Sequence, residues 1–260
     1  GIDSYKVNDS KKGVFILDKF QIDNIFSVLK EGIIREYYKN SDINKYVTSE
    51  SSNRYVIYSN RNTEIQKYPK TYKHLYSCRE IIDKKRWKES VPWYSLVRPR
   101  DENIFKNEKI VCPQRSLSNT FGYSNSEWYA GSDVFFITKK KESEIDMKYL
   151  LVLLNSHLYY KWLFYKGKRK GKYLELIGTP LKEIPIKIPS KRIQNKFVFL
   201  ADKIIDSKKN QEDTNRFECE VNVMVYQLYE LTYEEVLFID LEFGGHMSKE
   251  EYDSFSTLKN

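Results

Sequence analysis

Cysteine and histidine are scarce in this chain of 260 residues, which has three of each. The cysteines, Cys78, Cys112 and Cys219, lie far apart; no CxxC pair occurs, and an odd number argues against a disulfide framework. The histidines do not stand at metal-ligand spacing from one another or from the cysteines. The sequence therefore predicts no metal site and no disulfide-stabilised secreted domain, and a reducing cytoplasm is the expected setting.

Long hydrophobic runs are also missing. The longest apolar stretch, residues 150–165, is interrupted by Asn155, His157 and Lys161 and is shorter than the roughly 20 residues of a membrane span. The first residues do not have the pattern of a signal peptide, so we expect no membrane partner. The chain begins with Gly1 rather than Met, which suggests a piece of a longer protein.

Charge is abundant but unevenly distributed along the chain. The formal net charge is +8, while residues 211–260 contain twelve acidic and three basic residues, a balance of −9, so residues 1–210 carry +17. A basic body is typical of a protein that contacts a polyanion. The alternative is a basic protein that its charge keeps soluble.

The basic charge is most concentrated in residues 166–172, KGKRKGK, which hold five basic and no acidic residues. Apolar residues at three- and four-residue steps predict a helix over residues 146–165, with Asp146 as its N-cap and one face buried. Residues 173–177 read as a strand, and the prolines in residues 184–189 indicate an extended or edge segment. A rigid helix that ends in a flexible basic loop with two glycines suits a polyanion.

Elsewhere the pattern alternates between strands and helices. A helix is predicted over residues 18–29, with Phe20, Ile25, Phe26 and Leu29 facing inward, and another over residues 72–86. Short β-rich runs between turn residues in 92–137 predict an antiparallel or mixed sheet.

From Lys191 the pattern is helical, and Thr232 with Glu235 forms a capping box. We therefore predict an α+β fold with a mixed or antiparallel β-sheet, flanking helices and a helical C-terminal segment. The predicted divisions are a sheet-containing domain over residues 1–190, a helical segment over 191–243 and a polar, flexible tail over 244–260.

Several motifs in this order resemble a known family. They are Trp93-Tyr94, Arg98-Pro99-Arg100, Lys109-Ile110-Val111-Cys112-Pro113, Leu154-Asn155-Ser156-His157-Leu158-Tyr159-Tyr160, Tyr173-x-Glu175-Leu176 and Ile184-Pro185-Ile186. Together they are similar to the TaqI-like C-terminal specificity domain of bacterial DNA adenine methyltransferases and fused restriction-modification enzymes. The resemblance extends from Gly1-Ile2 to about residue 240. It implies a target-recognition domain that binds double-stranded DNA sequence-specifically beside a catalytic domain of the same polypeptide.

The catalytic parts of such an enzyme are absent from the sequence. There is no glycine-rich loop after a strand for S-adenosylmethionine, and no Pro-Pro, so the family's Asn-Pro-Pro-Tyr motif for the flipped adenine cannot occur. The resemblance therefore implies that S-adenosylmethionine and adenine-N6 methylation belong to a missing half, and that this chain is not an enzyme on its own. The Asp-x-Lys triplets, which a chain rich in Asp and Lys contains by chance, do not support a nuclease site.

Candidate DNA contacts combine basic, amide and aromatic side chains. Lys166, Lys168, Arg169, Lys170 and Lys172 suit phosphates, because they lie on a lysine-rich loop. Arg98, Arg100, Gln114, Arg115 and Ser116 suit base edges, because they lie at predicted strand ends or turns. Trp93, Lys109, Tyr123 and Tyr173 complete the predicted set.

Some of these residues have a structural alternative. Arg98 or Arg100 could pair with the neighbouring carboxylates of Asp101 or Glu102 inside the fold, and Trp93 is more typical of a core than of a stacking platform. His157 fits a core position better than a binding role. For the whole chain, the alternatives are a specificity subunit of a multi-subunit restriction-modification system, which should carry two recognition regions, and a basic nucleic-acid-binding or scaffold module without sequence readout.

Overall fold

The structure is a computed structural model that describes residues 13–26, 31–85 and 90–255. The Gly1-Ile2 segment of the family resemblance lies outside these residues. The chain forms two compact units. The first takes its described residues from Gly1–Asp42, Ser49–Asn107 and Asn125–Val134, and the second from Ile43–Thr48, Glu108–Ser124 and Phe135–Asn260.

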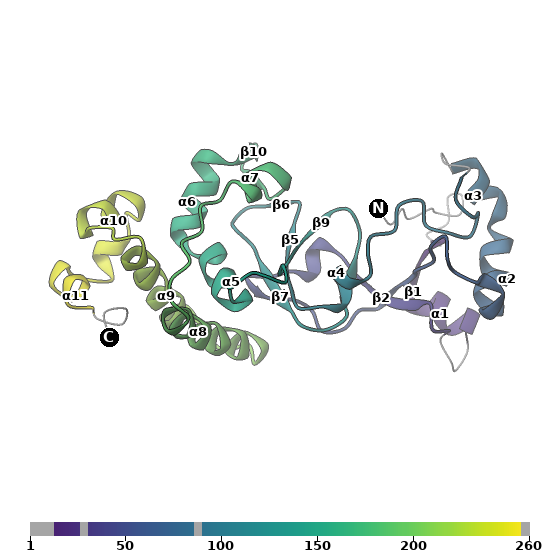
Figure 1. Cartoon of the computed structure of the whole chain (residues 1–260), viewed down its shortest axis with the longest axis horizontal. Coiled ribbons are helices and arrows are strands. Elements are labelled where there is room, and N and C mark those ends of the chain that lie inside the picture. Colours follow the sequence, from purple (N-terminus) through teal and green to yellow (C-terminus); the bar gives the residue numbers. More distant parts are fainter. Residues whose placement is uncertain (1–12, 27–30, 86–89, 256–260) are drawn as a thin grey trace. The chain divides into compact units, whose positions relative to one another are not determined.

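The first unit contains a four-stranded sheet in the order β1-β4-β2-β8. The strands β1, β4 and β2 are antiparallel neighbours, and β8 joins β2 in parallel. The elements of this unit are β1 (Ile16–Asp18), α1 (Lys19–Phe26), β2 (Ile34–Tyr38), β4 (Arg54–Ile57), α2 (Pro69–Ser77), α3 (Arg79–Lys85), α4 (Asn103–Lys106) and β8 (Tyr129–Ala130). Figure 1 labels the four helices with β1 and β2.

Helix α1 corrects one prediction. Ile22 and Phe26 are buried, but Phe20 is 71% exposed. Each helical residue turns about 100°, so Phe20 lies on the side opposite Ile22 and cannot share its face. Leu29, predicted to face inward as well, lies outside the described residues. The helix predicted over residues 72–86 is two helices, α2 and α3, which meet at Cys78.

The second unit contains two sheets and most of the helices. One sheet has the order β3-β7-β5-β9 and the other the order β10-β11-β6. The strands are β3 (Tyr46–Val47), β5 (Lys109–Pro113), β6 (Arg115–Ser116), β7 (Gly122–Ser124), β9 (Val134–Thr138), β10 (Lys168–Lys170) and β11 (Tyr173–Glu175). The helices are α5 (Met147–Asn155), α6 (His157–Lys166), α7 (Gly178–Lys182), α8 (Lys191–Lys209), α9 (Asn215–Leu228), α10 (Tyr233–Ile239) and α11 (Lys249–Ser254). Mixed sheets with flanking helices confirm the predicted α+β class.

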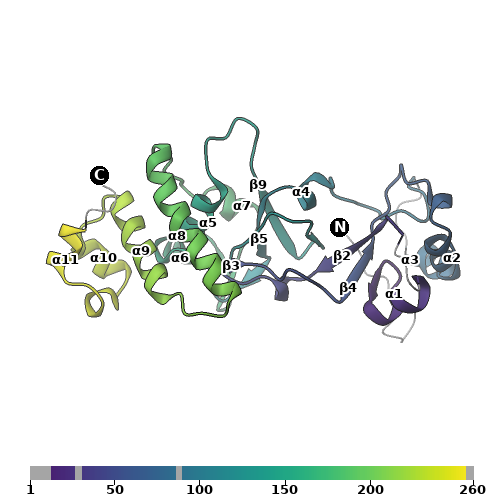
Figure 2. The same ribbon diagram turned by 90° about the horizontal axis from the view of Figure 1, so that it is seen from below.

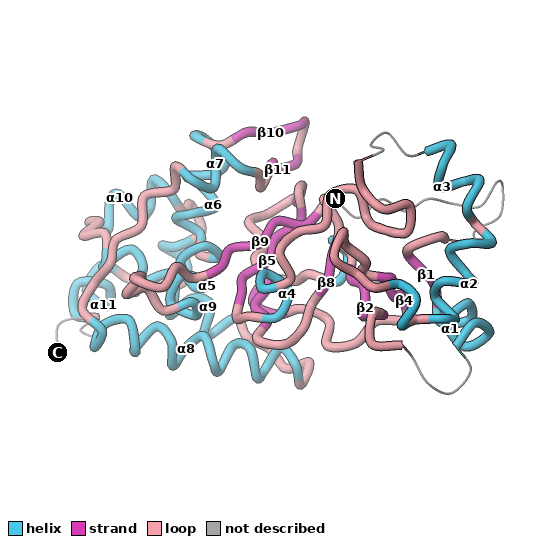
Figure 3. Tube along the Cα trace, turned by 45° about the vertical axis from the view of Figure 1, so that its right-hand side comes forward, coloured by secondary structure: helices cyan, strands magenta, loops and turns pink. Residues whose placement is uncertain are grey.

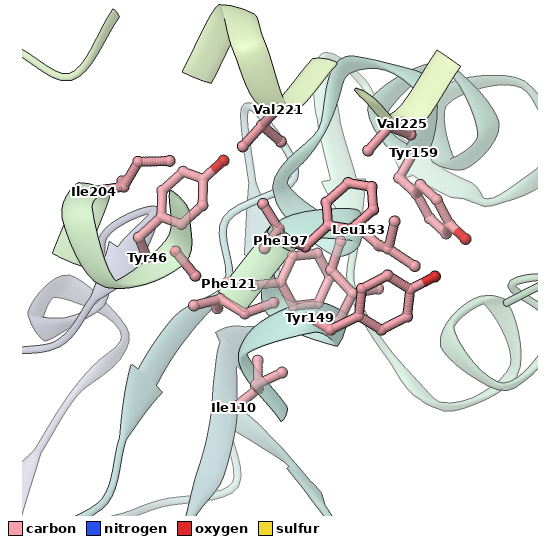
Figure 4. Packing of buried hydrophobic residues seen from close by; sticks show 14 of the residues in the cluster. Tyr46, Ile110, Phe121, Tyr149, Leu153, Tyr159, Phe197, Ile204, Val221 and Val225 are labelled. Atoms are coloured by element: carbon pink, nitrogen blue, oxygen red, sulfur yellow. The ribbon is translucent and has the colours of Figure 1, made fainter. Parts of the chain in front are cut away.

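Helix α5 lies at the centre of the second unit's core. Its Leu153 is fully buried in one cluster with Phe121, Phe197 and Val221, which come from the segment before β7, from α8 and from α9 (Figure 4). Full burial of a leucine or valine side chain stabilises a fold by about 1.5–3 kcal/mol. The apolar helix predicted from the sequence therefore forms the core on which the strands and later helices pack.

The predicted helix over residues 146–165 is interrupted at Ser156, whose ψ of 159° is extended. The N-cap is confirmed, because the Asp146 side chain accepts a hydrogen bond of 2.9 Å from the Lys148 backbone N–H. The break resets the helical phase, so Tyr165, predicted on the buried face, is 74% exposed. Helix α6 therefore begins a new direction after α5.

The C-terminal helices share the core of α5 and α6: α8 packs against α5, and α9 against α6 (Figure 2). The boundary between residues 190 and 191 stays a prediction. The capping box at Thr232 and Glu235 is confirmed. The predicted polar, flexible tail, residues 244–260, contains helix α11, which has a capping box of Ser248 and Glu251 and a buried Tyr252. Residues 256–260 lie outside the described part. No helix within the described ranges is both long and apolar enough to span a membrane.

Candidate nucleic-acid interface

The basic residues 166–172 form the end of α6 and a β-hairpin, where a flexible loop was predicted. Strands β10 and β11 are antiparallel, with Lys170 opposite Tyr173, so Gly171 and Lys172 form a two-residue turn (Figure 3). Gly171 has φ of +60°, a conformation that glycine adopts without strain. The positive charges are therefore held on a defined ribbon that follows directly from a helix.

The pairing register gives this three-stranded sheet two different faces. Lys168 lies opposite Glu175, and Glu175 lies opposite Arg115, so these three side chains form one row across the sheet. Because side chains alternate along a strand, Lys170 and Tyr173 lie on the same face as this row. We call Arg115, Lys168, Lys170, Tyr173 and Glu175 the outer face.

The opposite, inner face carries Arg169, Leu174 and Ser116, one from each strand. Leu174 is buried in the core of the second unit. The Arg169 guanidinium lies 4.1 Å from the centre of the Phe164 ring, a cation–π contact that holds it against α6. The Ser116 hydroxyl lies 2.8 Å from that of Thr120. The Arg169 side chain nevertheless stays exposed, so a large partner can reach it as well as the outer face.

The outer face is strongly basic. Lys168 and Lys170 are exposed, as are Lys166 and Lys172 beside them. Within the part of the chain that the structure describes, no carboxylate forms an ion pair with any of these four lysines. Their charges are therefore available to a polyanion.

Arg115 is the exception, because its Nε lies 3.0 Å from Glu175 Oε1. The Arg115 side chain is 44% exposed and that of Glu175 is 19% exposed, so the carboxylate fixes the direction of a guanidinium that still reaches solvent. Sequence reasoning missed Glu175 as this partner, because the two residues are 60 positions apart and meet only through the strand register.

Three other predicted contacts of the second unit are engaged within the fold. Lys109 in β5 has no exposed surface, so it cannot reach DNA. The Tyr123 hydroxyl donates a 2.7 Å hydrogen bond to Glu108. Gln114 is half-buried and is held through its backbone, whose carbonyl oxygen accepts a 3.0 Å hydrogen bond from the Leu176 backbone N–H; the side-chain amide takes no part in this bond.

The remaining predicted contacts, Trp93, Arg98 and Arg100, belong to the first unit. Trp93 packs edge-on against neighbouring tyrosines, and the Arg79 guanidinium lies 4.5 Å from its ring centre, which supports the packing interpretation. Arg100 Nη1 donates a 3.1 Å hydrogen bond to the Val134 carbonyl, and burial lowers the pKa of its guanidinium. Arg98 is exposed. The contact with Val134 thus gives Arg100 a structural role.

Among the described residues, no three His, Cys, Asp or Glu side chains gather as a metal ion would require. Burial lowers the pKa of His157, whose backbone N–H begins α6 by donating a 2.8 Å hydrogen bond to Asn222 Oδ1. The position of His157 is thus explained by the helix junction.

Comparisons with known proteins point to one class. A family model described as the TaqI-like C-terminal specificity domain matches residues 35–186. The type II methyltransferase M.HincII of Haemophilus influenzae is 27% identical over 145 residues, which are 52% of this chain and 29% of that protein. The type II methyltransferase M.HindII of Haemophilus influenzae is 28% identical over 114 residues, 41% of this chain and 22% of the relative. The chain thus spans less than a third of the length of either relative.

Proposed function

This chain belongs to the TaqI-like C-terminal specificity domains, and from that premise we propose that it is the target-recognition half of a site-specific DNA methyltransferase of a restriction-modification system. Its partner is double-stranded DNA, which it binds sequence-specifically. Adenine-N6 is the proposed methylation target. S-adenosylmethionine and the transfer chemistry belong to a catalytic domain of the same polypeptide, outside this chain.

The observation that carries the proposal is the outer face of the β10–β11–β6 sheet. Strands can enter a groove of DNA, and the β10–β11 hairpin with β6 beside it presents a short three-stranded surface for such a contact. Lys166, Lys168, Lys170 and Lys172, which form no ion pair with a described carboxylate, supply positive charge for phosphates.

Arg115 is the best-placed side chain for reading a base. It shares the outer face with Lys168 and Lys170, and its ion pair with Glu175 restrains the guanidinium. A restrained guanidinium can donate two hydrogen bonds to O6 and N7 of guanine, and such a contact contributes about 1–3 kcal/mol of discrimination. Tyr173, 41% exposed on the same face, can add an apolar or hydroxyl contact.

The test is selection of bound sequences from a random duplex library by this chain, repeated over a range of salt concentrations. We expect affinity to fall steeply with salt and the bound pool to contain a motif. Arg115→Ala should relax one position of that motif, while Lys170→Ala should weaken all sequences alike. Absence of binding at low salt would refute DNA recognition, and salt-dependent binding without a motif would refute sequence readout by this chain.

A further inference from the structure

Two buried asparagines tie the segment after β6 to the junction of α5 and α6. Asn119 has no exposed surface, and its Nδ2 donates hydrogen bonds of 2.7 and 2.8 Å to the carbonyl oxygens of Leu154 and Ser156. These carbonyls lie at the end of α5, where backbone acceptors have no partner within the helix. Asn119 thus caps α5 from a distant segment of the chain.

Asn155 makes the reciprocal connection. Its Oδ1 accepts a 3.0 Å hydrogen bond from the Phe121 backbone N–H, and its Nδ2 donates one of 2.8 Å to the Phe121 carbonyl. The same Nδ2 lies 3.2 Å from the Leu151 carbonyl of α5, and the side chain is buried. One amide therefore binds both backbone groups of Phe121, as a neighbouring strand would.

The two ends of this connection lead to the two parts of the outer face. The segment 117–121 follows β6, which carries Arg115. Helix α6 starts at the junction and runs directly into β10, which carries Lys168 and Lys170. The asparagines therefore join, at one point, the strand that holds the base-reading candidate and the helix that holds the phosphate-binding hairpin.

Asparagine suits this role because a buried amide is costly unless its groups are paired. The bonds to Phe121, Leu154 and Ser156 run between segments, and a fully satisfied buried network permits few alternative arrangements. Leucine at either position would fill space but would allow the segment after β6 to shift along α5. A shift of about 1 Å at a recognition surface is enough to lose directional contacts.

We propose that Asn119 and Asn155 are positioning residues for sequence discrimination. They anchor the segment after β6 to the α5–α6 junction and reinforce the pairing of β6 with β11, so that Arg115 meets a base while the hairpin lysines meet phosphates. The inference rests on the proposed function of the outer face. In this proposal Asn119 and Asn155 contribute to sequence discrimination, and the hairpin lysines account for the salt-dependent part of the affinity.

The chain offers a matched control in Asn222, whose Oδ1 accepts a 2.8 Å hydrogen bond from the His157 N–H at the other side of the same junction. Asn222→Ala removes a contact at the start of α6 without touching the segment after β6. The experiment compares Asn155→Ala, Asn119→Ala and Asn222→Ala in the 260-residue chain. For each, it measures thermal unfolding, affinity for the selected duplex and for a scrambled duplex, and the salt dependence of both.

The Asn119 and Asn155 variants should lose discrimination between the two duplexes by about tenfold or more, the equivalent of one base contact. Their affinity for the scrambled duplex and its salt dependence should stay within about twofold of wild type. Asn222→Ala should keep the wild-type ratio of the two affinities, even if its unfolding temperature falls as much as that of the Asn119 and Asn155 variants. If Asn155→Ala does not fold, Asn119→Ala provides the readout, because it removes the bonds to Leu154 and Ser156 and leaves the Asn155 bonds to Phe121 in place.

If the Asn119 and Asn155 variants discriminate between the two duplexes as well as Asn222→Ala does, the positioning role is overturned. The two asparagines would then affect stability alone. A fall in affinity for both duplexes by the same factor would also overturn it. A wild-type chain that does not distinguish the two duplexes would instead refute the proposed function, so the two failures are separable.

Discussion

Replacing Lys170 by alanine tests the assignment of the hairpin to phosphates. Lys170 lies on the outer face next to the turn, is exposed and has no ion pair with a described carboxylate. Its removal should leave the fold intact, because an exposed substitution of this kind changes the free energy of unfolding by less than about 0.5 kcal/mol. Any change in DNA binding would then report on the contact itself.

The magnitude follows from counterion release. Each neutralised phosphate contributes about 0.9 to the slope of log affinity against log salt, so one lost contact weakens binding about eightfold at 0.1 M salt. Replacing Lys168, Lys170 and Lys172 together should reduce the slope by about 2.7 and the affinity by about 500-fold under the same conditions. The loss should be the same for the selected and the scrambled duplex.

The assay is fluorescence anisotropy with labelled duplexes between about 50 and 300 mM salt, where these slopes are measurable. Lys140→Ala is the control, because Lys140 is also exposed and carries the same charge but belongs to the loop between β9 and α5 and not to the hairpin. An unchanged slope for Lys170→Ala would refute the phosphate assignment. So would an equal reduction for Lys140→Ala, since the hairpin would then be one part of a diffuse positive field.

Three further expectations concern the fold and its pH response. Gly171→Ala should strain the turn by about 1 kcal/mol, because φ is +60° there, and should speed amide hydrogen exchange in β10 and β11; unchanged exchange would contradict it. Thr232→Ala should lower the free energy of unfolding, measured by denaturant unfolding, by about 0.5–2 kcal/mol, because the capping box is lost. Ser51→Ala is the control, since Ser51 is exposed and outside the helices, and it should leave the free energy of unfolding unchanged. Burial lowers the pKa of His74, so as the pH falls the unfolded chain binds a proton at a higher pH than the folded chain does. The free energy of unfolding should therefore decrease as the pH drops below about 6.5. His74→Gln should make this decrease smaller when unfolding is compared at about pH 7.5 and 5.

Local signals in the sequence were sufficient for the features that depend on neighbouring residues. The Asp146 N-cap and the Thr232–Glu235 capping box involve side chains within a single helical turn, and both are present. The concentration of positive charge in residues 166–172 was also visible directly. What the sequence could not supply was the strand register that turns this run into a hairpin with two different faces.

Burial and contacts between residues far apart in the sequence account for the predictions that the structure corrects. Lys109 begins a strand whose residues are all buried, so its charge was misleading as a sign of exposure. Ser156 breaks a run of apolar residues that has a continuous helical period, and the break is stabilised by Asn119 and Asn222, far away in sequence. Such partners become visible only once the chain has folded.

The interleaved path of the chain limits how a recognition specificity can be transplanted. The chain connects the two units at five points, and β8, from the segment Asn125–Val134, completes a sheet whose other strands come before residue 58. A crossover at residue 42 or 107 would therefore combine β2 of one parent with β8 of another. A join after residue 134 keeps that sheet but separates β6, with Arg115, from the β10–β11 hairpin. Exchange of the whole outer face therefore requires residues 43–48, 108–124 and those from 135 onward to be moved together.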